Sequence, residues 1–137
     1  MTYKFRKDPI SGMILVYIQM NENHEFKMML DTGASNTTFD INALLMAAYP
    51  IETIIATGMA ETAGGIIEVD IIQTKVISAF GHTVRGMKVQ VYDFLKHGIL
   101  SDYDGLLGLD FFENTEFTIN MKNQTIEVRK CGKRQIT

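Results

Sequence analysis

A short apolar segment that ends on a carboxylate constrains this chain more than any other feature. Met-Met-Leu at residues 28–30 leads directly into Asp31, Thr32 and Gly33. Successive side chains of a strand point to opposite faces, so burial of Leu30 determines where Asp31 points. A carboxylate at the end of a buried strand is costly unless it is hydrogen-bonded or shares a proton. A neighbouring hydroxyl and a glycine that permits close backbone approach meet that requirement, so the segment predicts a carboxyl group held in one place.

A hydrophobic-hydrophobic-glycine segment, Leu-Leu-Gly at residues 106–108, follows later in the chain. Alone, it reads as a buried strand that glycine ends, just as Asp-Thr-Gly alone could be a chance strand-to-turn junction. Together, and with Ala34 and Ser35 completing the first motif, the two segments resemble the active-site signature of pepsin-type and retroviral-type aspartic proteases. In that family the second segment lies beside the strand that carries the catalytic aspartate. It then leads into a short helix, here expected at Asp110–Asn114.

The resemblance is closest to the single-lobe, retropepsin-like proteases of cellular organisms. It implies a mostly β fold built as a closed six-stranded-type barrel, with a flap hairpin and one or two short helices, in a single domain that spans residues 1–137. It also implies that Asp31 is the catalytic residue and that Thr32, Gly33 and Ala34 support it. The expected function is aspartic endopeptidase activity on a peptide or protein substrate, with no cofactor.

Two adjacent glycines between β-rich segments predict a hairpin tip, because glycine removes the steric limits on the turn. Considered alone, this is an ordinary surface hairpin. The resemblance implies that it is the flap, in which the backbone of Thr62, Ala63, Gly64 and Gly65 hydrogen-bonds an extended substrate as an added strand. The region has no tyrosine of the pepsin kind.

The chemistry of the family requires two carboxyl groups that share one proton, since like charges about 3 Å apart cannot both ionise. The chain contains a single Asp-Thr-Gly and no Asp-Ser-Gly. Asp102, Asp104 and Asp110 are interpreted as turn residues or helix caps instead of an internal partner. A C2 homodimer that brings Asp31 of each subunit to the axis is therefore expected, and a monomer is expected to be inactive.

Further features of the dimer follow from the resemblance. Thr32 would hydrogen-bond across the axis, and the terminal strands, Tyr3–Arg6 and Thr125–Arg129, would pair between subunits. Leu-Asp at residues 109–110 stands where retroviral enzymes carry an arginine, which leaves the bracing of the dimer open. Ala34 stands where pepsin-like enzymes have a serine whose hydroxyl lowers the pKa of the carboxyl pair. Its absence predicts an optimum of about pH 5–7, above the strongly acidic range.

Alternating apolar residues and turn signals predict strands along most of the chain. One helix is expected at Asn42–Ala48, with Asp40 or Asn42 as its N-cap. Turns are expected at Asp8–Gly12 and, within a hairpin, at Lys122–Gln124. The predicted strands are Tyr3–Arg6, Met13–Met20, Phe26–Leu30, Ile51–Ala56, Ile66–Ile77, Thr83–Tyr92, Glu116–Met121 and Thr125–Arg129.

Composition excludes several other classes of protein. Hydrophobic residues make up 46% of the chain and the formal net charge is −3, which argues against disorder and against a strongly charged binding surface. The basic residues at 129–134 have no aromatic residues among them and are interpreted as a solvated tail, so no nucleic-acid partner is expected. A single cysteine, Cys131, suits a reducing compartment, and the apolar run at residues 13–18 is too short to span a membrane. A cytoplasmic protein without a membrane or metal partner is expected. The histidines predicted at the surface are His24, His82 and His97.

Three functions remain open on these grounds. The first is a homodimeric aspartic endopeptidase. The second is a catalytically silent dimeric module of the same fold that only binds peptides; the intact Asp-Thr-Gly argues against it, because a binding module needs no carboxylate pair. The third is phosphoryl transfer through an aspartyl phosphate. That chemistry expects alternating strands and helices, a helix directly after Asp31 and further metal-binding carboxylates, and the β-rich pattern argues against it.

Overall fold

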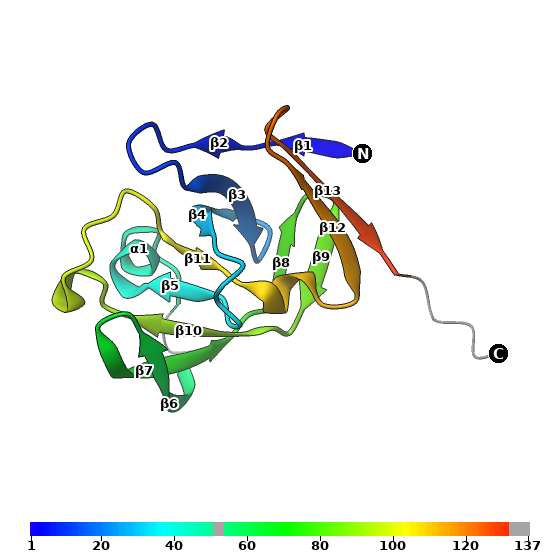
Figure 1. The fold of residues 1–137 in the computed structure, drawn as a ribbon. Coiled ribbons are helices and arrows are strands. Elements are labelled where there is room, and N and C mark those ends of the chain that lie inside the picture. The colour runs from blue at the N-terminus through cyan, green and yellow to red at the C-terminus, as the bar shows by residue number, and fades with distance from the viewer. Residues whose placement is uncertain (51–53, 132–137) are drawn as a thin grey trace.

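Strands make up most of the computed structural model, which describes residues 1–50 and 54–131 (Figure 1). One group of strands comprises β2 (Arg6–Lys7), β3 (Ile14–Met20), β4 (His24–Leu30), β5 (Thr38–Asp40), β6 (Ile54–Thr62), β7 (Gly65–Gln73), β8 (Val76–Ala79), β9 (His82–Arg85), β10 (Lys88–Tyr92) and β11 (Gly105–Leu107). A second group comprises β1 (Thr2–Lys4), β12 (Thr115–Asn120) and β13 (Thr125–Lys130). The helical segments are α1 (Ile41–Met46) and the 3-10 turns η2 (Leu95–His97) and η3 (Leu109–Phe112).

The first group forms one large open sheet. Its strands follow the order β6-β7-β10-β5-β11-β4-β3-β8-β9, and β2 pairs with β3 beside this path. The predicted mostly β fold is confirmed, whereas its closed barrel is not, because no sheet in the described part of the chain closes on itself. Its end strands are β6 and β9; within the described residues, β6 pairs only with β7 and has no fully buried residue.

The second group forms a small sheet in which the first and the last described strands meet. β1 pairs with β13, with Tyr3 opposite Ile126, and β12 and β13 form the predicted hairpin, with Phe117 opposite Val128. β13 therefore has a strand on each of its edges, in the order β1-β13-β12. The prediction that Thr125–Arg129 pairs between subunits does not fit this arrangement. Within the described residues, the free edges of the small sheet belong to β1 and β12.

Two long predicted strands are each divided in two. The strand expected at residues 66–77 divides into β7 and β8, because the backbone N–H and the hydroxyl of buried Thr74 both donate to the carbonyl of Met87, at 2.9 Å each. The strand expected at residues 83–92 divides into β9 and β10 at Gly86. Its φ of 70° lies in the left-handed region that favours glycine.

Other boundaries differ for local reasons. Part of the strand expected at Ile51–Ala56 lies outside the described residues, and β6 continues well beyond its predicted end. The three residues of β5 are too few to show alternation, so no strand is predicted there. The first predicted strand, Tyr3–Arg6, is interrupted at the buried Phe5 and becomes β1 and β2, which pair with different strands.

The predicted helices are confirmed in position. Asp40 caps α1, since its carboxylate accepts a hydrogen bond from the backbone N–H of Asn42 at 3.2 Å. The helix ends two residues early, and Ala48 adopts a φ of 54° just beyond it. The helix expected at Asp110–Asn114 is the 3-10 turn η3.

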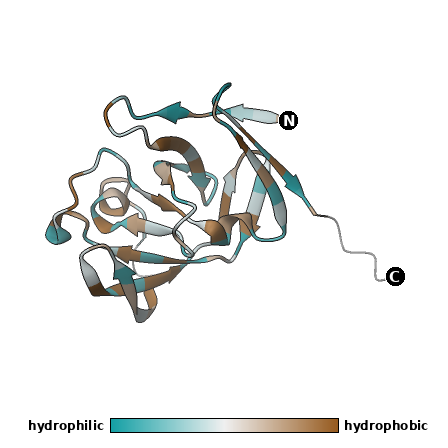
Figure 2. Cartoon of the chain, viewed as in Figure 1, coloured by the Kyte–Doolittle hydropathy of each residue, from teal (hydrophilic) through white to brown (hydrophobic). Residues whose placement is uncertain are grey.

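The hydrophobic core connects the two sheets. It contains Phe26 and Phe39 from the large sheet, Ile126 from the small sheet, and Phe111 from η3, all almost inaccessible to solvent. Hydropathy distinguishes buried from exposed strands: apolar residues, brown in Figure 2, lie along β3, whereas exposed β2 is hydrophilic and teal. The packing of η3 into the core places the end of β11 next to the loop that follows β4.

The prediction that all three histidines lie at the surface is wrong for His82. Its side chain is only 7% exposed, and its Nε2 lies 2.9 Å from the carbonyl oxygen of Phe111. Burial lowers the pKa of the ring, which favours the neutral form. Its position opposite Ala79 in the β8–β9 hairpin turns the ring inward, a direction that its polar neighbours in the sequence do not reveal.

Candidate active site

Asp31 lies at the end of β4, where backbone hydrogen bonds hold it on both sides. β4 runs parallel to β11 with Leu30 beside Leu107, and the N–H of Asp31 donates to the carbonyl of Leu107 at 3.0 Å. The N–H of Gly33 donates to Oδ1 of Asp31 at 2.9 Å, and the N–H of Ala34 donates to its backbone carbonyl at 3.1 Å. The other carboxylate oxygen, Oδ2, accepts no hydrogen bond from the described residues. One oxygen of this half-buried carboxylate is therefore fixed and the other is available.

The two residues after Asp31 are exposed. The hydroxyl of Thr32 has no hydrogen-bond partner among residues 1–50 and 54–131, so it is available to a group outside the chain. At Gly33, an added Cβ would lie 3.2 Å from Oδ1 of Asp31, a spacing tighter than ordinary contact. Glycine at this position therefore lets the backbone approach the carboxylate closely enough to donate to it.

The Leu-Leu-Gly segment lies where the sequence predicts it. β11 is inserted between β4, to which it is parallel, and β5, to which it is antiparallel. Both of its flanking glycines are sterically required. A Cβ at Gly105 would collide with the carbonyl of Thr38, and one at Gly108 would lie 2.8 Å from the carbonyl oxygen of Ala34. That same carbonyl accepts the N–H of Leu109 at 2.8 Å, which ties the segment to the Asp31 loop.

A buried hydroxyl and a carboxylate complete this connection. The backbone N–H and the Oγ1 of Thr37 donate to the two carboxylate oxygens of Asp110, at 2.9 Å and 2.7 Å. Oγ1 also accepts the N–H of Gly108 at 3.1 Å, and Thr37 is fully buried. The Asp31 loop is thus fastened to the start of η3 by side chains as well as by backbone. We call these three residues the Thr37–Asp110 clamp.

The clamp is not predicted from the sequence. Asp110 is expected there to be a turn residue or cap, although its carboxylate binds a residue 73 positions away. A carboxylate two residues after a hydrophobic-hydrophobic-glycine segment that is expected to be buried is the one signal that indicates such a partner, since an unpaired carboxylate there would be costly. The sequence does not say which hydroxyl satisfies it.

Removal of the carboxylate from the clamp is expected to destabilise the fold. In Asp110→Ala, the buried N–H and hydroxyl of Thr37 both lose their acceptor, which is expected to cost about 2–4 kcal/mol of unfolding free energy. Asp110→Asn keeps one acceptor oxygen and is expected to cost less than half as much. Urea denaturation of the three proteins at neutral pH measures the difference. Equal stability of the wild type and Asp110→Ala would contradict the role of the clamp.

The clamp also predicts a pH dependence of stability. Burial raises the pKa of Asp110 above its ordinary value of 3.8, although hydrogen bonds from Thr37 oppose the rise. A carboxyl whose pKa is higher in the folded chain favours folding most below 3.8, and that contribution is lost as pH rises through the folded pKa. The unfolding free energy of the wild type, relative to that of Asp110→Asn, is therefore expected to fall as pH rises from about 3 to 7. A constant or increasing difference in urea denaturation would show that the hydrogen bonds outweigh burial.

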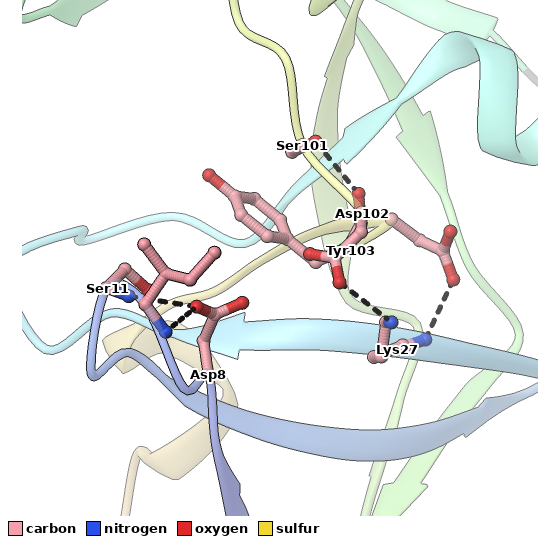
Figure 3. A network of polar contacts seen from close by, with 8 residues as sticks. Asp8, Ser11, Lys27, Ser101, Asp102 and Tyr103 are labelled. Carbon is pink, nitrogen blue, oxygen red and sulfur yellow. Dashed lines mark hydrogen bonds and ion pairs between the residues drawn. The ribbon is translucent and has the colours of Figure 1, made fainter.

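The other carboxylates near the end of β4 are engaged away from Asp31. Asp104 accepts the backbone N–H of Lys27 at 2.8 Å, and burial raises its pKa. The Nζ of Lys27 lies 3.4 Å from Asp102, and the two side chains point toward one another (Figure 3). The carboxylate of Asp8 accepts two N–H groups of its own turn. These carboxylates hold loops in place, and none lines the cleft beside Asp31.

A cleft of about 450 Å³ lies between the Asp31 loop and the β6–β7 hairpin. Among the predicted site residues, Asp31, Gly33, Ala34, Thr62 and Ala63 line it, whereas Thr32, Gly64 and Gly65 do not. The tip of the hairpin is fixed by a hydroxyl: Oγ1 of Thr62 donates to the carbonyl of Gly65 at 2.9 Å and accepts the N–H of Gly64 at 3.2 Å. Residues of the hairpin and of the Asp31 loop therefore line the same cleft.

The cleft also has a floor that the sequence does not reveal. Thr38 from β5, Gln90 and Tyr92 from β10, and Leu106 from β11 line it. These residues come from strands that are distant in the chain and adjacent in the sheet, so only the strand order brings them together.

Within the described ranges, no group of three or more His, Cys, Asp or Glu side chains could hold a metal ion. No helix among the described residues is long and apolar enough to cross a membrane.

Comparison with known proteins agrees with this geometry. A family model described as aspartyl protease matches residues 16–111, which include the Asp31 loop, the hairpin and β11. The fold resembles the crystal structure of a retropepsin-like aspartic protease from Rickettsia conorii, with a TM-score of 0.67 and 21% sequence identity. The alignment covers 94% of this chain and 91% of that chain. At this level of identity, the likeness shows the fold alone. No curated protein matches the chain.

Proposed function

The chain belongs to the aspartyl protease family, and on that premise we propose that it is an aspartic endopeptidase whose active site forms between two copies of the chain. One observation carries the proposal. Asp31 presents an available carboxylate oxygen in a cleft beneath a hairpin, and no other aspartate of the described residues lines that cleft. Half of an acid–base pair is therefore present in each chain.

The second half is supplied by Asp31 of another copy, related by a twofold axis. The exposed positions of Thr32 and Gly33 favour this arrangement, because both can face a partner without rearrangement. The hydroxyl of Thr32, which has no partner among the described residues, hydrogen-bonds across the axis in this proposal, and the hydrogen bond from Gly33 keeps each carboxylate oriented. The free edges of β1 and β12 offer the strands through which two small sheets can join.

The two carboxyl groups share one proton, because both cannot ionise at close approach. The ionised member removes a proton from a water molecule as that water attacks the peptide carbonyl carbon. The neutral member donates a hydrogen bond to the carbonyl oxygen as it becomes tetrahedral, and the proton then passes to the leaving nitrogen as the C–N bond breaks. The β6–β7 hairpin binds the extended peptide through its backbone and excludes water.

The test is cleavage of a mixed peptide library between about pH 4 and 8 by the wild type and by Asp31→Asn. Cleavage by the wild type alone, at a rate per chain that falls as the protein is diluted, is expected for a shared site. A stable dimer that cleaves neither peptides nor an unfolded protein at any pH would overturn the proposal. That result would instead support the silent peptide-binding module of the same fold.

Ala34 provides a further prediction about pH. Its side chain lines the cleft while its N–H and carbonyl are engaged by Asp31 and Leu109, so a serine hydroxyl can be added without loss of these bonds. A hydroxyl that donates to the ionised carboxylate favours ionisation. Ala34→Ser is therefore expected to move the acidic limb of the pH–rate profile about 0.5–1 unit lower. Ala56→Ser, on an exposed position outside the cleft, is the control and should leave the profile unchanged. A shift of the limb upward, or none, would contradict the argument.

A further inference from the structure

One row of side chains crosses the face of the large sheet that lies under the cleft. It runs through five neighbouring strands, β7, β10, β5, β11 and β4, and each residue lies beside the next in the register of the sheet. The members are, in order, Ile71, Gln90, Thr38, Leu106 and Met29. The chain neighbours of Gln90 and Thr38 on the opposite face, Val89, Val91 and Phe39, are buried in the core. The row therefore points away from the core, and its three central members line the cleft.

The middle of this row is polar although its ends are apolar. Thr38 is only 4% exposed, and its Oγ1 lies 3.4 Å from both Oε1 of Gln90 and the carbonyl oxygen of Asn36. A hydroxyl has one hydrogen, so it can donate to only one of these two acceptors, and both distances are long for such a bond. A polar pair that lies this deep in the cleft therefore has unused hydrogen-bonding capacity.

The carboxamide of Gln90 has the larger share of that capacity. Its nitrogen, which carries two hydrogens, has no hydrogen-bond partner within the described residues. Rotation of the amide by half a turn would direct the oxygen to the cleft instead of the nitrogen. In either orientation one end of the group has no protein partner, and an aliphatic ligand group placed against it would bury it unpaired, at a cost in affinity.

We propose that Gln90 and Thr38 form a polar subsite that selects peptides with a carboxamide side chain, asparagine or glutamine, at one position near the cleaved bond. The inference rests on the proposed endopeptidase function and specifies its substrate class. A carboxamide carries both a donor and an acceptor, so it matches either orientation of Gln90.

Charged side chains fit this subsite less well. Among the described residues no lysine or arginine lines the cleft, while Asp31 and Glu61 do, so an anionic side chain would meet repulsion and no counter-charge there. Among the described residues, neither carboxylate is hydrogen-bonded to Gln90 or Thr38, and the pair offers a cationic side chain only neutral groups in exchange for its water. Leu106 on one side and Ile71 on the other flank the polar pair with apolar groups, which limits the polar surface to the length of one short side chain.

A positional-scanning octapeptide library with asparagine, leucine, aspartate or lysine fixed at each position tests the subsite. The wild type is expected to cleave the asparagine peptides about tenfold faster, in kcat/KM, than the leucine peptides at one position. Gln90→Leu is expected to reverse that preference at the same position. Gln19→Leu makes the same substitution at an exposed site on β3, outside the cleft, and should keep the wild-type preference.

Binding of the same peptides to Asp31→Asn, with and without Gln90→Leu, tests the subsite separately from the protease function. Cleavage with an aliphatic preference at every position, or a carboxamide preference that Gln90→Leu leaves unchanged, would overturn the subsite and leave the protease function intact. No cleavage, together with carboxamide-selective binding that depends on Gln90, would overturn the protease function and support the subsite. No selectivity in either measurement would overturn the subsite.

Discussion

Replacement of Asp31 by asparagine is expected to lower kcat/KM for peptide hydrolysis by about 10⁴-fold or more, the scale of loss seen when a residue central to a catalytic unit is removed. An asparagine can neither accept the proton from the attacking water nor donate one to the carbonyl oxygen. Because the site needs one Asp31 from each chain, the substitution removes both carboxyl groups of the pair at once. The residual rate is therefore expected to be that of a cleft that still binds the peptide but has no catalytic carboxyl group.

The same substitution is expected to leave the fold nearly unchanged. The Oδ1 of an asparagine can still accept the N–H of Gly33, and Asp31 is only half-buried, so the unfolding free energy should change by no more than about 1 kcal/mol. Urea denaturation and sedimentation of Asp31→Asn check this point. Asp102→Asn is the matched control, since Asp102 is exposed and pairs with Lys27. An equal loss of activity in Asp102→Asn would indicate an internal partner for Asp31.

Alanine in place of Gly105 is expected to cost at least about 3–5 kcal/mol of unfolding free energy, enough to prevent folding at moderate temperature. Gly105 begins β11, which is bonded to β4 on one side and β5 on the other. Its added Cβ would collide with the carbonyl of Thr38 and lie 2.9 Å from Cε of Met28 and 3.1 Å from Cα of Phe39. The methionine can move, but the two backbone atoms belong to a strand in the middle of the sheet.

Gly58→Ala is the matched control for this prediction. Gly58 also lies in a strand, and an added Cβ would meet only the side chain of Ile71, at the ordinary contact distance of 3.7 Å. Its unfolding free energy is expected to stay within about 1 kcal/mol of the wild type. Denaturation midpoints of the two variants measure the contrast. A Gly105→Ala protein as stable as Gly58→Ala would show that β5 can move away from β11.

The sequence predicts those parts of the site that local chemistry determines. Asp31 and its glycine neighbour are recognisable because a carboxylate at the end of a buried strand is costly unless it is hydrogen-bonded or shares a proton. The position of the Leu-Leu-Gly segment beside the strand that leads into Asp31 is also predicted, since the resemblance specifies that these two distant segments lie together. The hairpin over the cleft follows from two glycines. These features depend on a few adjacent residues each.

The remaining features depend on contacts between strands that lie far apart in the chain. Thr37 and Asp110 meet only because β11 pairs with β5, and Gln90 lies beside Thr38 only because β10 pairs with β5. Neither pairing leaves a pattern within a window of ten residues. The closed barrel is expected from family resemblance, but its closure depends on the outer edge of β6, which no other strand of the described residues covers. The sequence therefore predicts where most strands lie along the chain better than it predicts the order in which they pair.

In the proposed enzyme, each active site takes one Asp31 from each of two chains. Wild type and Asp31→Asn, mixed in varied proportions, unfolded and refolded together at constant total concentration, test it directly. If only dimers with two Asp31 residues cleave peptide, activity follows the square of the wild-type fraction, and an equal mixture retains about a quarter of full activity. Activity in direct proportion to the wild-type fraction, about one half in the equal mixture, would show that a single chain holds a complete site and would contradict the account.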